Sequence, residues 1–369
     1  MAITMTTMNS HGPNRHPRCV IDLKAIQHNY RTLKAIAGGN QLIAVVKADA
    51  YGHGAIEVAQ SLPDADAFAV AAVGEGISLR DAGVEQKILI MGGFIRPEEL
   101  QLCIDRKLDP VVHHSAHREM LQEYMQLDDL EIWIKVDSGM GRLGFSPDVL
   151  DQVMETLIDI PSLGHIRMMT HFANADDMSS EFTKQQITVS DSLGYSGYEW
   201  GYANSAGILG WSDSHRAWVR SGIALYGANP MSDRDQNRVN LKPAMTMKTS
   251  VLAVNSHKEG EVIGYANTYT CPKDMRIAVI ACGYADGYPR HKVATAQVSI
   301  HGQLCDIVGR VSMDMITVDV TDVDHVQIDD EVILFGVSPD VNQTADCAET
   351  ISYEILCNAG AHAKREYIK

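Results

Sequence analysis

The sequence has few of the features that mark metal-binding, nucleic-acid-binding or membrane-spanning proteins. None of its seven cysteines belongs to a C-x-x-C pair, which argues against a zinc ribbon and against a disulfide framework. Lysine and arginine number 31 against 47 aspartates and glutamates, and the formal net charge of −16 argues against a general nucleic-acid-binding surface. No stretch is long and apolar enough to span a bilayer. We therefore expect no metal site, no nucleic-acid partner and no membrane partner.

The beginning of the chain lacks the hydrophobic core of a secretory signal. Residues 1–17 are polar, so we expect a disordered tail there. Most cysteines are expected to be small buried apolar residues of a protein that works in the reducing cytoplasm. The length of 369 residues and the hydrophobic content of 45% are enough for a large barrel and a second domain.

Short apolar runs alternate with amphipathic segments along the first two thirds of the chain. Asp22 is the expected N-cap of the first helix, which Gly38 and Gly39 end. Segments 115–127 and 147–158 are further expected helices. Eight apolar runs, of which the fourth and the eighth are the weakest, are expected strands: residues 41–46, 67–72, 87–91, 109–112, 130–136, 164–171, 198–203 and 217–222. This alternation indicates an α/β fold and fits an N-terminal (β/α)8 TIM-type barrel, but the two weak runs would not by themselves justify a count of eight strands.

The pattern changes after about residue 241. The apolar runs become short and β-branched, and turns rich in glycine and aspartate separate them: residues 249–253, 276–281, 296–300, 315–320 and 331–335. Such spacing is typical of a mostly antiparallel β domain. We therefore expect three parts, namely a tail (1–17), a barrel domain (18–240) and a C-terminal β domain (241–369).

Lys47 is the most informative single residue. It follows the apolar run 42–46 and precedes a glycine-containing turn at 48–54. An amine in that place lies at the carboxyl end of a barrel strand, where barrel enzymes keep their chemistry. A desolvated lysine can lose its proton and act as a base, as a nucleophile or as a Schiff-base partner. The local pattern alone leaves open a commoner arrangement, in which the lysine caps the strand and extends to water.

The segment around Lys47, VVKADAYGHG, is followed by seven further motifs. They are KVDSGMGRLG (135–144), THFA (170–173), ANS (203–205), VRSGIALYG (219–227), GYADGYPR (283–290), VSMDM (311–315) and YEIL (353–356). In these motifs and in their order, the chain resembles the alanine racemases. The resemblance extends from about residue 20 to about residue 367. It implies the full count of eight barrel strands, and it implies that a first strand near residues 18–22 pairs with the β domain.

The resemblance implies a cofactor, an assembly and two catalytic residues. Alanine racemases are pyridoxal 5'-phosphate (PLP) enzymes, and the lysine at the place of Lys47 carries the cofactor covalently. Racemisation needs an acid/base group on each face of the substrate, and by resemblance these are Lys47 and Tyr265 of the partner subunit. We therefore expect a homodimer that interconverts L- and D-alanine and supplies D-alanine for peptidoglycan. Without the resemblance, Tyr265 fits an ordinary cross-strand aromatic better.

The resemblance also assigns the residues around the cofactor. The expected cofactor-binding residues are Lys47, Tyr51, Arg142, His171, Asn204, Ser205, Arg220, Gly222, Ile223 and Tyr353. Among them, the hydroxyls of Tyr51, Ser205 and Tyr353 and the backbone N–H groups of Gly222 and Ile223 are expected to bind the phosphate.

The substrate is expected to meet a second set of residues. Arg142 and the backbone N–H of Met313 are expected to bind its carboxylate. Lys135, Asp314 and Tyr284 are expected to support the site. Three tyrosines at the entrance are expected to favour a small side chain: Tyr265, Tyr284 and Tyr353.

Arg220 is expected to face the pyridine nitrogen of the cofactor. A guanidinium stays cationic and only donates hydrogen bonds, so this nitrogen should stay unprotonated and the ring should be a weaker electron sink. In the family pattern Tyr265, His171 and Arg220 form a hydrogen-bonded chain, which should lower the pKa of the tyrosine from about 10. Lys135 matches a position that is carbamylated in some relatives. As an ammonium it would be repelled by Arg142.

Several alternatives stay open. A racemase of broader specificity would act on serine or lysine. A decarboxylase of the same two-part build would carry an acid where this chain has Arg220, and a PLP-carrier barrel would lack the second domain. A metal-dependent barrel hydrolase could use His165 and His171, although no H-x-H pair at a strand end supports it. The chain departs from the family at residues 264–266, Gly-Tyr-Ala, where relatives commonly have Ser-Tyr-Gly, so the backbone around the tyrosine is expected to differ.

Overall fold

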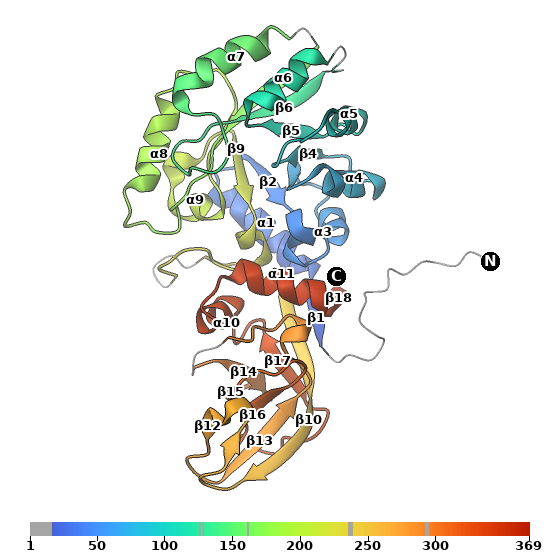
Figure 1. The fold of residues 1–369 in the computed structure, drawn as a ribbon, viewed down its shortest axis with the longest axis vertical. Helices are drawn as coiled ribbons and strands as arrows, with labels where there is room; N and C mark the ends of the chain where they lie inside the picture. The colour runs from blue at the N-terminus through green and yellow to red at the C-terminus, as the bar shows by residue number, and fades with distance from the viewer. Residues whose placement is uncertain (1–16, 125–126, 128, 161, 235–238, 292–294) are drawn as a thin grey trace, which may run out of the picture. The chain divides into compact units, whose positions relative to one another are not determined.

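The computed structural model describes residues 17–124, 127, 129–160, 162–234, 239–291 and 295–369 (Figure 1). Nearly all of the expected N-terminal tail lies outside the described residues. The chain divides into two compact units. We call the first the barrel unit, formed by Ile26–Ala50 and Gly54–Lys242. We call the second the β unit, formed by the described residues before Ile26, by Tyr51–His53 and by Pro243–Lys369.

The barrel unit contains a closed barrel of eight parallel strands, as predicted. The strands are β2 (Gln41–Val45), β3 (Ala67–Val70), β4 (Lys87–Ile90), β5 (Asp109–Val112), β6 (Leu130–Lys135), β7 (Leu163–Met169), β8 (Trp200–Gly201) and β9 (Trp218–Ser221). Strand β2 pairs with β9 and closes the barrel. The two weakest expected strands, β5 and β9, are both present. Strand β8 is shorter than expected, with two residues in place of six.

Helices connect the barrel strands, as Figure 1 shows. They are α1 (Leu23–Ile36), α3 (Ala55–Ser61), α4 (Val73–Asp81), α5 (Pro97–Asp105), α6 (Ser115–Glu123), α7 (Leu150–Ile158), α8 (Phe182–Asp191) and α9 (Ser205–Gly210). The expected N-cap of α1 is confirmed, because Asp22 Oδ1 accepts a hydrogen bond from the Ala25 N–H at 2.9 Å. Helix α6 ends earlier than expected, because Tyr124 is extended, with φ −81° and ψ 119°.

A charged network lies toward the amino end of the barrel. Glu131 Oε2 lies 2.5 Å from Lys87 Nζ and 2.6 Å from Arg167 Nη1. The Arg167 guanidinium also lies over two indole rings, 5.7 Å from the centroid of Trp133 and 5.6 Å from that of Trp218. Arg167 is the buried member of this network, and a buried charge is tolerated where it is paired in this way. In TIM barrels the chemistry takes place at the opposite end, where the strands have their carboxyl ends.

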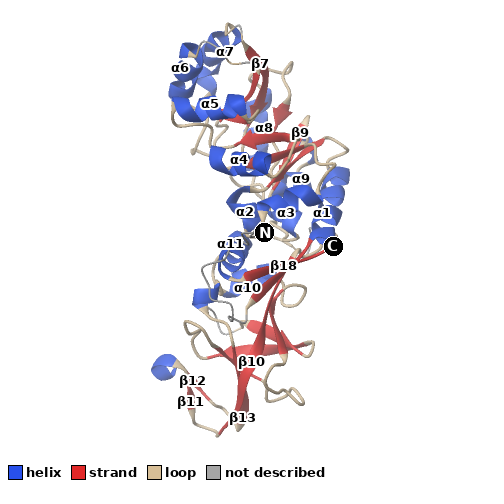
Figure 2. Cartoon of the chain, turned by 90° about the vertical axis from the view of Figure 1, so that its right-hand side faces the viewer, coloured by secondary structure: helices blue, strands red, loops and turns tan. Residues whose placement is uncertain are grey.

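The β unit is built on an eight-stranded, mostly antiparallel sheet, also as predicted (Figure 2). The strand order is β13-β16-β15-β14-β17-β10-β1-β18. The strands are β1 (Arg18–Asp22), β10 (Met245–His257), β13 (Met275–Ile280), β14 (Gln297–Ile300), β15 (Gln303–Val308), β16 (Ile316–Asp319), β17 (Glu331–Phe335) and β18 (Lys364–Ile368). As the resemblance implies, β1 joins this sheet, between β10 and β18.

Smaller elements complete the β unit. They are the strand pair β11 (Val262–Ile263) and β12 (Tyr269–Thr270), and the helices α10 (Val341–Cys347) and α11 (Ser352–His362). Five of the seven cysteines are buried, as expected for small apolar residues. Within the described part of the chain, no helix combines the length and the apolar character that crossing a membrane requires.

Candidate active site

Lys47 follows strand β2 after one intervening residue, Val46, and begins a left-handed turn. The turn is α2 (Lys47–Tyr51), in which Ala48, Asp49 and Ala50 have φ/ψ of 52°/48°, 53°/49° and 54°/48°. A left-handed helical conformation costs roughly 1–2 kcal/mol for each residue other than glycine. Such strain concentrates at active sites, where the surrounding structure holds it. The lysine therefore begins a segment that needs support from its neighbours.

Glu75, in the first turn of α4, provides part of that support. Its Oε1 accepts a hydrogen bond from the Ala48 N–H at 2.7 Å, while Oε2 accepts from the N–H groups of Ala71 and Ala72 at 2.7 and 3.1 Å. Sequence reasoning missed this residue. A glutamate at the third position of a helix is a capping signal that could have found it.

Arg220 is almost fully buried in strand β9. Its Nη1 donates to the carbonyl of Gly201 at 2.7 Å, and its Nη2 donates to the carbonyls of Thr170 and Tyr202 at 2.6 and 3.2 Å. Burial lowers the pKa of Arg220 to about 10, so the guanidinium is still cationic at neutral pH. A Cβ at position 201 would lie 2.9 Å from Nη1, which explains the glycine in β8. These contacts hold the guanidinium firmly and use three of its five N–H groups.

Donors of hydrogen bonds gather after strands β8 and β9. Ser205 is buried, and its Oγ accepts a hydrogen bond from the Gly222 N–H at 3.0 Å. Ile223 begins the next turn, η3 (Ile223–Tyr226). The side chain of Asn204 caps α9, because its Oδ1 accepts from the Gly207 N–H at 2.9 Å. The structure thus brings Ser205 and Gly222 together. The Asn204 side chain instead caps helix α9.

Lys135 ends strand β6 and is only 7% exposed. Burial, and then the charges of Arg220 and Arg142, lower its pKa to about 7, although the Asp137 carboxylate opposes the shift. About half of the Lys135 side chains are therefore neutral amines at neutral pH. The expected repulsion between Lys135 and Arg142 is present.

Arg142 is exposed on the loop that follows β6. The loop is organised by Asp137, whose Oδ1 accepts hydrogen bonds from the N–H groups of Gly139 at 3.0 Å and of Gly141 at 3.1 Å. Burial works against the ionised form of Asp137, but these backbone donors hold the pKa of its carboxyl below its ordinary value. The loop returns to the strand where the Phe145 N–H donates to the carbonyl of Lys135 at 2.8 Å. Arg142 is thereby kept near the carboxyl end of the barrel.

His171 marks the point where the charged residues converge. Its pKa lies well below its ordinary value, because of burial and because of the positive charges of Arg220, Lys135, Arg142 and Lys47. The imidazole is therefore neutral at neutral pH. Five of the predicted site residues, from four different strand ends, thus lie within electrostatic reach of one another.

Gln186 fixes the segment that carries His171. Its Nε2 donates to the carbonyl of His171 and to Ser138 Oγ, both at 3.1 Å, and its Oε1 accepts from the Ala173 N–H at 2.9 Å. Ser138 Oγ is also 2.7 Å from Thr170 Oγ1. Sequence reasoning missed Gln186, since a glutamine in the middle of helix α8 carries no local signal.

Tyr51 and Tyr353 lie together in the β unit, with ring centroids 5.8 Å apart. The backbones beside them approach closely, and a Cβ at Gly360 would lie 1.9 Å from the carbonyl oxygen of Gly52. Burial and the neighbouring Tyr353 and Cys357 raise the pKa of Tyr51. The hydroxyl therefore stays protonated and is able to donate a hydrogen bond.

Tyr265 is 67% exposed in the β unit. The residues on either side explain the departure from the family sequence. Gly264 has φ 77° and ψ −175°, a conformation that is open almost only to glycine. Ala266 has φ 59°, a left-handed conformation that an alanine adopts at a cost. Gly264 thus allows the backbone conformation before Tyr265, and Ala266 adopts a strained left-handed conformation after it.

Tyr284 and the loop that carries Met313 and Asp314 are also neighbours in the β unit. The Tyr284 N–H donates to the carbonyl of Ser312 at 3.1 Å, and a Cβ at Gly283 would lie within 2.4 Å of the backbone of this loop. Met313 is 58% exposed and Tyr284 is partly exposed. The structure therefore brings Tyr284 and Met313 together, while their expected place in the partner's site stays a prediction.

The donors of the barrel unit fit the chemistry of PLP. A primary amine at Lys47 matches the aldehyde, a buried hydroxyl at Ser205 with nearby backbone N–H groups matches the phosphate, and a buried guanidinium at Arg220 matches an unprotonated ring nitrogen. Among the residues that the structure describes, no group of histidines, cysteines and carboxylates could hold a metal ion. His165 and His171 stand at opposite ends of β7, roughly 20 Å apart by strand geometry, so they cannot share a metal. This arrangement fits the class of PLP-dependent barrel enzymes.

Comparisons with known proteins identify the family within that class. Residues 21–230 match the model of the alanine racemase N-terminal domain, and residues 244–367 match that of the C-terminal domain. The alanine racemase of Azoarcus sp. (strain BH72) is 43% identical over 93% of this chain and 97% of its own length. That of Xanthomonas axonopodis pv. citri is 39% identical over 93% and 94%.

Solved structures agree with the sequence comparison. The biosynthetic alanine racemase of Pseudomonas aeruginosa has a TM-score of 0.92 and 36% identity, covering 96% of this chain and 100% of that one. The alanine racemase of Bartonella henselae, with covalently bound pyridoxal phosphate, has a TM-score of 0.86 and 30% identity over 96% and 100%. The chain belongs to the alanine racemase family of isomerases.

Proposed function

We propose that this protein racemises alanine with PLP, using Lys47 and Tyr265 of the partner subunit as the two acid/base groups. The observation that carries the proposal is the convergence of Lys47, Arg142, Arg220 and Lys135 around His171 at the carboxyl end of the barrel. The relatives named above as alanine racemases support the substrate.

Lys47 holds the cofactor and moves a proton on one face of the substrate. When bound, PLP supplies an electron sink that stabilises negative charge at the substrate's α-carbon. Lys47 Nζ removes the α-proton on its own face, or returns a proton there in the opposite direction. The strained turn after Lys47, held by Glu75, fixes the direction from which this amine approaches.

Tyr265 of the partner subunit serves the opposite face. Its side chain is 67% exposed on the β unit, so it is available to a second copy of the chain. The neutral His171 and the cationic Arg220 favour the ionised phenol where the tyrosine enters, which makes it a better base at neutral pH. The site is complete only in a homodimer.

Arg220 limits the reaction to proton transfer. Its guanidinium only donates hydrogen bonds and is held by three backbone carbonyls, so it cannot deliver a proton to the ring nitrogen. A decarboxylase of similar build would place an acid there. The negative charge is therefore spread less widely, which favours rapid return of a proton to the α-carbon over side reactions.

Lys135 holds Arg142 through a carbamate. The neutral amine that its pKa of about 7 provides can attack carbon dioxide, forming an N–C bond and releasing one proton. The product is an anion between Arg142 and Arg220. Two like-charge repulsions become attractions, and Arg142 is then held in place to bind the substrate carboxylate.

The substrate's side chain meets aromatic residues. Tyr353 lies against Tyr51, and the partner subunit contributes Tyr265, Tyr284 and the backbone N–H of Met313 to the carboxylate and the entrance. A crowded entrance favours alanine over larger amino acids. We place the enzyme in the cytoplasm, where it supplies D-alanine for peptidoglycan.

Chiral analysis tests this function. The purified protein with PLP would be incubated separately with L-alanine, L-serine and L-lysine, and the D-enantiomers would be measured over time. We expect rapid formation of D-alanine and little of the other two. Mainly D-serine or D-lysine would keep the mechanism and change the substrate. No racemisation of any of them, with PLP bound, would refute the proposal.

A further inference from the structure

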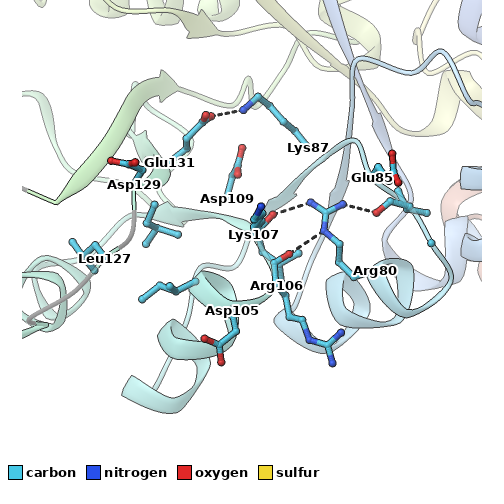
Figure 3. Close-up of a pocket in the computed structure, with 15 residues that line it drawn as sticks. Arg80, Glu85, Lys87, Asp105, Arg106, Lys107, Asp109, Leu127, Asp129 and Glu131 are labelled. Atoms are coloured by element: carbon cyan, nitrogen blue, oxygen red, sulfur yellow. Dashed lines mark hydrogen bonds and ion pairs between the residues drawn. The ribbon is translucent and has the colours of Figure 1, made fainter.

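A cavity of about 730 Å³ lies at the amino ends of strands β4, β5 and β6. Its lining includes Arg80, Lys87, Arg106, Asp109 and Glu131, and Figure 3 shows these side chains around it. The amino end of a TIM barrel is the end opposite to the catalytic residues. The cavity is therefore separate from the PLP site.

Most of the basic side chains that line the cavity are already engaged. Arg80 donates to four backbone carbonyl oxygens at 2.6–2.9 Å. Lys87 pairs with Glu131 at 2.5 Å, and Arg106 pairs with Asp81 at 2.6 Å. The Arg80 donors are therefore used by the backbone, and the charges of Lys87 and Arg106 are offset by their carboxylate partners, so these side chains offer few free donors to an anion in the cavity.

The remaining charge of the lining is mainly negative. Four lining carboxylates make no ion pair within the described parts of the chain: Glu85, Asp105, Asp109 and Asp129. Lys107, a basic residue of the lining, likewise makes no ion pair with the residues that the structure describes. A positively charged ligand is therefore favoured over a negatively charged one.

Asp109 is the unusual member of this set, because it is only 8% exposed. Its carboxylate accepts no hydrogen bond from the described residues, and Figure 3 shows it between Lys107 and the Lys87–Glu131 pair. A carboxylate that receives no donor from the protein keeps its hydrogen-bonding capacity for water or for a ligand. The carboxylate is aimed into a space that is large enough to hold a donor.

The charges around Asp109 offset only part of the effect of burial on its pKa. Burial raises the pKa of Asp109 to about 7, and Glu131 adds to the shift, while Lys87, Arg167 and Arg80 lower it. The carboxyl is thus about half protonated at neutral pH. A cationic donor beside it would favour the ionised form.

We propose that this cavity binds a small diamine or polyamine, one ammonium group of which is held by Asp109. An ammonium carries three N–H donors, which is what an unpartnered carboxylate lacks. The cavity is far larger than one ammonium group, and the other lining carboxylates, such as Asp105 and Glu85, can receive a second one. A metal ion is a poorer occupant, because the described residues contain no group of ligands that could hold one.

Titration calorimetry with 1,4-diaminobutane on the full-length PLP-loaded protein tests the proposal. We expect saturable binding that is about tenfold tighter near pH 8 than near pH 6, because only the ionised form of Asp109 binds and its share rises through pH 7. The ligand stays doubly charged at both values. Asp109→Asn should remove the binding, and Asp64→Asn, which removes an exposed acid outside this cavity, should leave it unchanged.

Several results would overturn the proposal. One is the absence of saturable binding near pH 8, and another is binding of equal strength in Asp109→Asn, which would mean general attraction to an acidic protein. Magnesium chloride or the uncharged 1,4-butanediol binding as tightly as 1,4-diaminobutane would also contradict a site for a diamine. Should Asp109→Asn fail to fold, the pH dependence of binding to the unaltered protein tests the proposal. Binding that does not change between pH 6 and pH 8 would exclude Asp109 as the group that holds the ammonium.

Discussion

At the scale of single residues, the proposed racemisation depends first on Lys47. Lys47→Ala should lose the covalent link to PLP and its characteristic visible absorbance, and racemisation should fall by at least roughly a thousandfold. The other PLP-binding groups, Ser205 and Arg220, remain, so the variant should still bind the cofactor weakly. Absorbance spectra after gel filtration, with and without borohydride reduction, would measure the link. A covalent adduct retained by the variant would contradict the role of Lys47.

Lys135 carries the second prediction at this scale. The protein equilibrated with 13C-labelled bicarbonate should show one carbamate carbon resonance that is missing in Lys135→Met. The carbamate forms from the neutral amine, whose share rises with pH through a pKa of about 7, so the signal should weaken as the pH falls below 7. A spectrum without the resonance above pH 7 would show that Lys135 is not modified, and Arg142 would then need another explanation.

Ala266 carries a prediction about stability. It has φ 59° in the turn after Tyr265, a conformation that glycine adopts without the steric cost. Ala266→Gly should therefore raise the free energy of unfolding by up to about 1 kcal/mol. Thermal unfolding would measure the change, and the same substitution at Ala348, which has φ −95°, should not stabilise the protein. A clear loss of stability in Ala266→Gly would show that the turn is not strained.

At the scale of elements, the left-handed turn after β2 is held from outside. Glu75→Gln replaces one of two acceptor oxygens that serve three backbone N–H groups, so the free energy of unfolding should fall by about 1–3 kcal/mol. The displaced turn should also lower kcat more than it raises KM, because Lys47 would be misplaced. Glu57→Gln, an exposed glutamate on α3, is the matched control. Unchanged kcat in Glu75→Gln would mean that the turn needs no such support.

The elements that could be predicted from the sequence are those with a strong local pattern. The barrel strands follow from apolar runs, and Asp22 and the glycine pair after α1 mark that helix. Strand β8 shortens to two residues because its position beside Arg220 is set by packing across the barrel, which no local pattern contains. Strands β15 and β18 were not predicted, because neither contains a continuous run of buried apolar residues. Helices α10 and α11 were not predicted either.

In the candidate active site, too, residues within a sequence motif were predicted, and residues that act on a distant segment were not. The proximity of Lys47, Arg142, His171 and Arg220 was predictable, because motifs mark these residues and because the strand ends of a barrel converge. Glu75 and Gln186 were missed, since each acts by holding backbone that belongs to another motif. The cavity around Asp109 was missed as well, because its lining comes from three αβ loops with no shared pattern.

At the scale of the whole molecule, the proposed function requires two chains. Each complete site takes Lys47 from one subunit and Tyr265 from its partner. In this account Tyr265→Phe keeps the bound PLP and its absorbance but loses almost all conversion of L- to D-alanine, because the second face lacks its proton-transfer group. Lys47→Ala and Tyr265→Phe are therefore each inactive as homodimers.

Mixing these two inactive variants tests the central claim most directly. If subunits pair at random after joint unfolding and refolding, half of the dimers are mixed, and each mixed dimer holds one intact site and one doubly altered site. We predict that L- to D-alanine conversion returns to about a quarter of the wild-type rate. Conversion that stays at the level of the separate variants, with mixed dimers verified by mass spectrometry, would contradict a site shared between subunits.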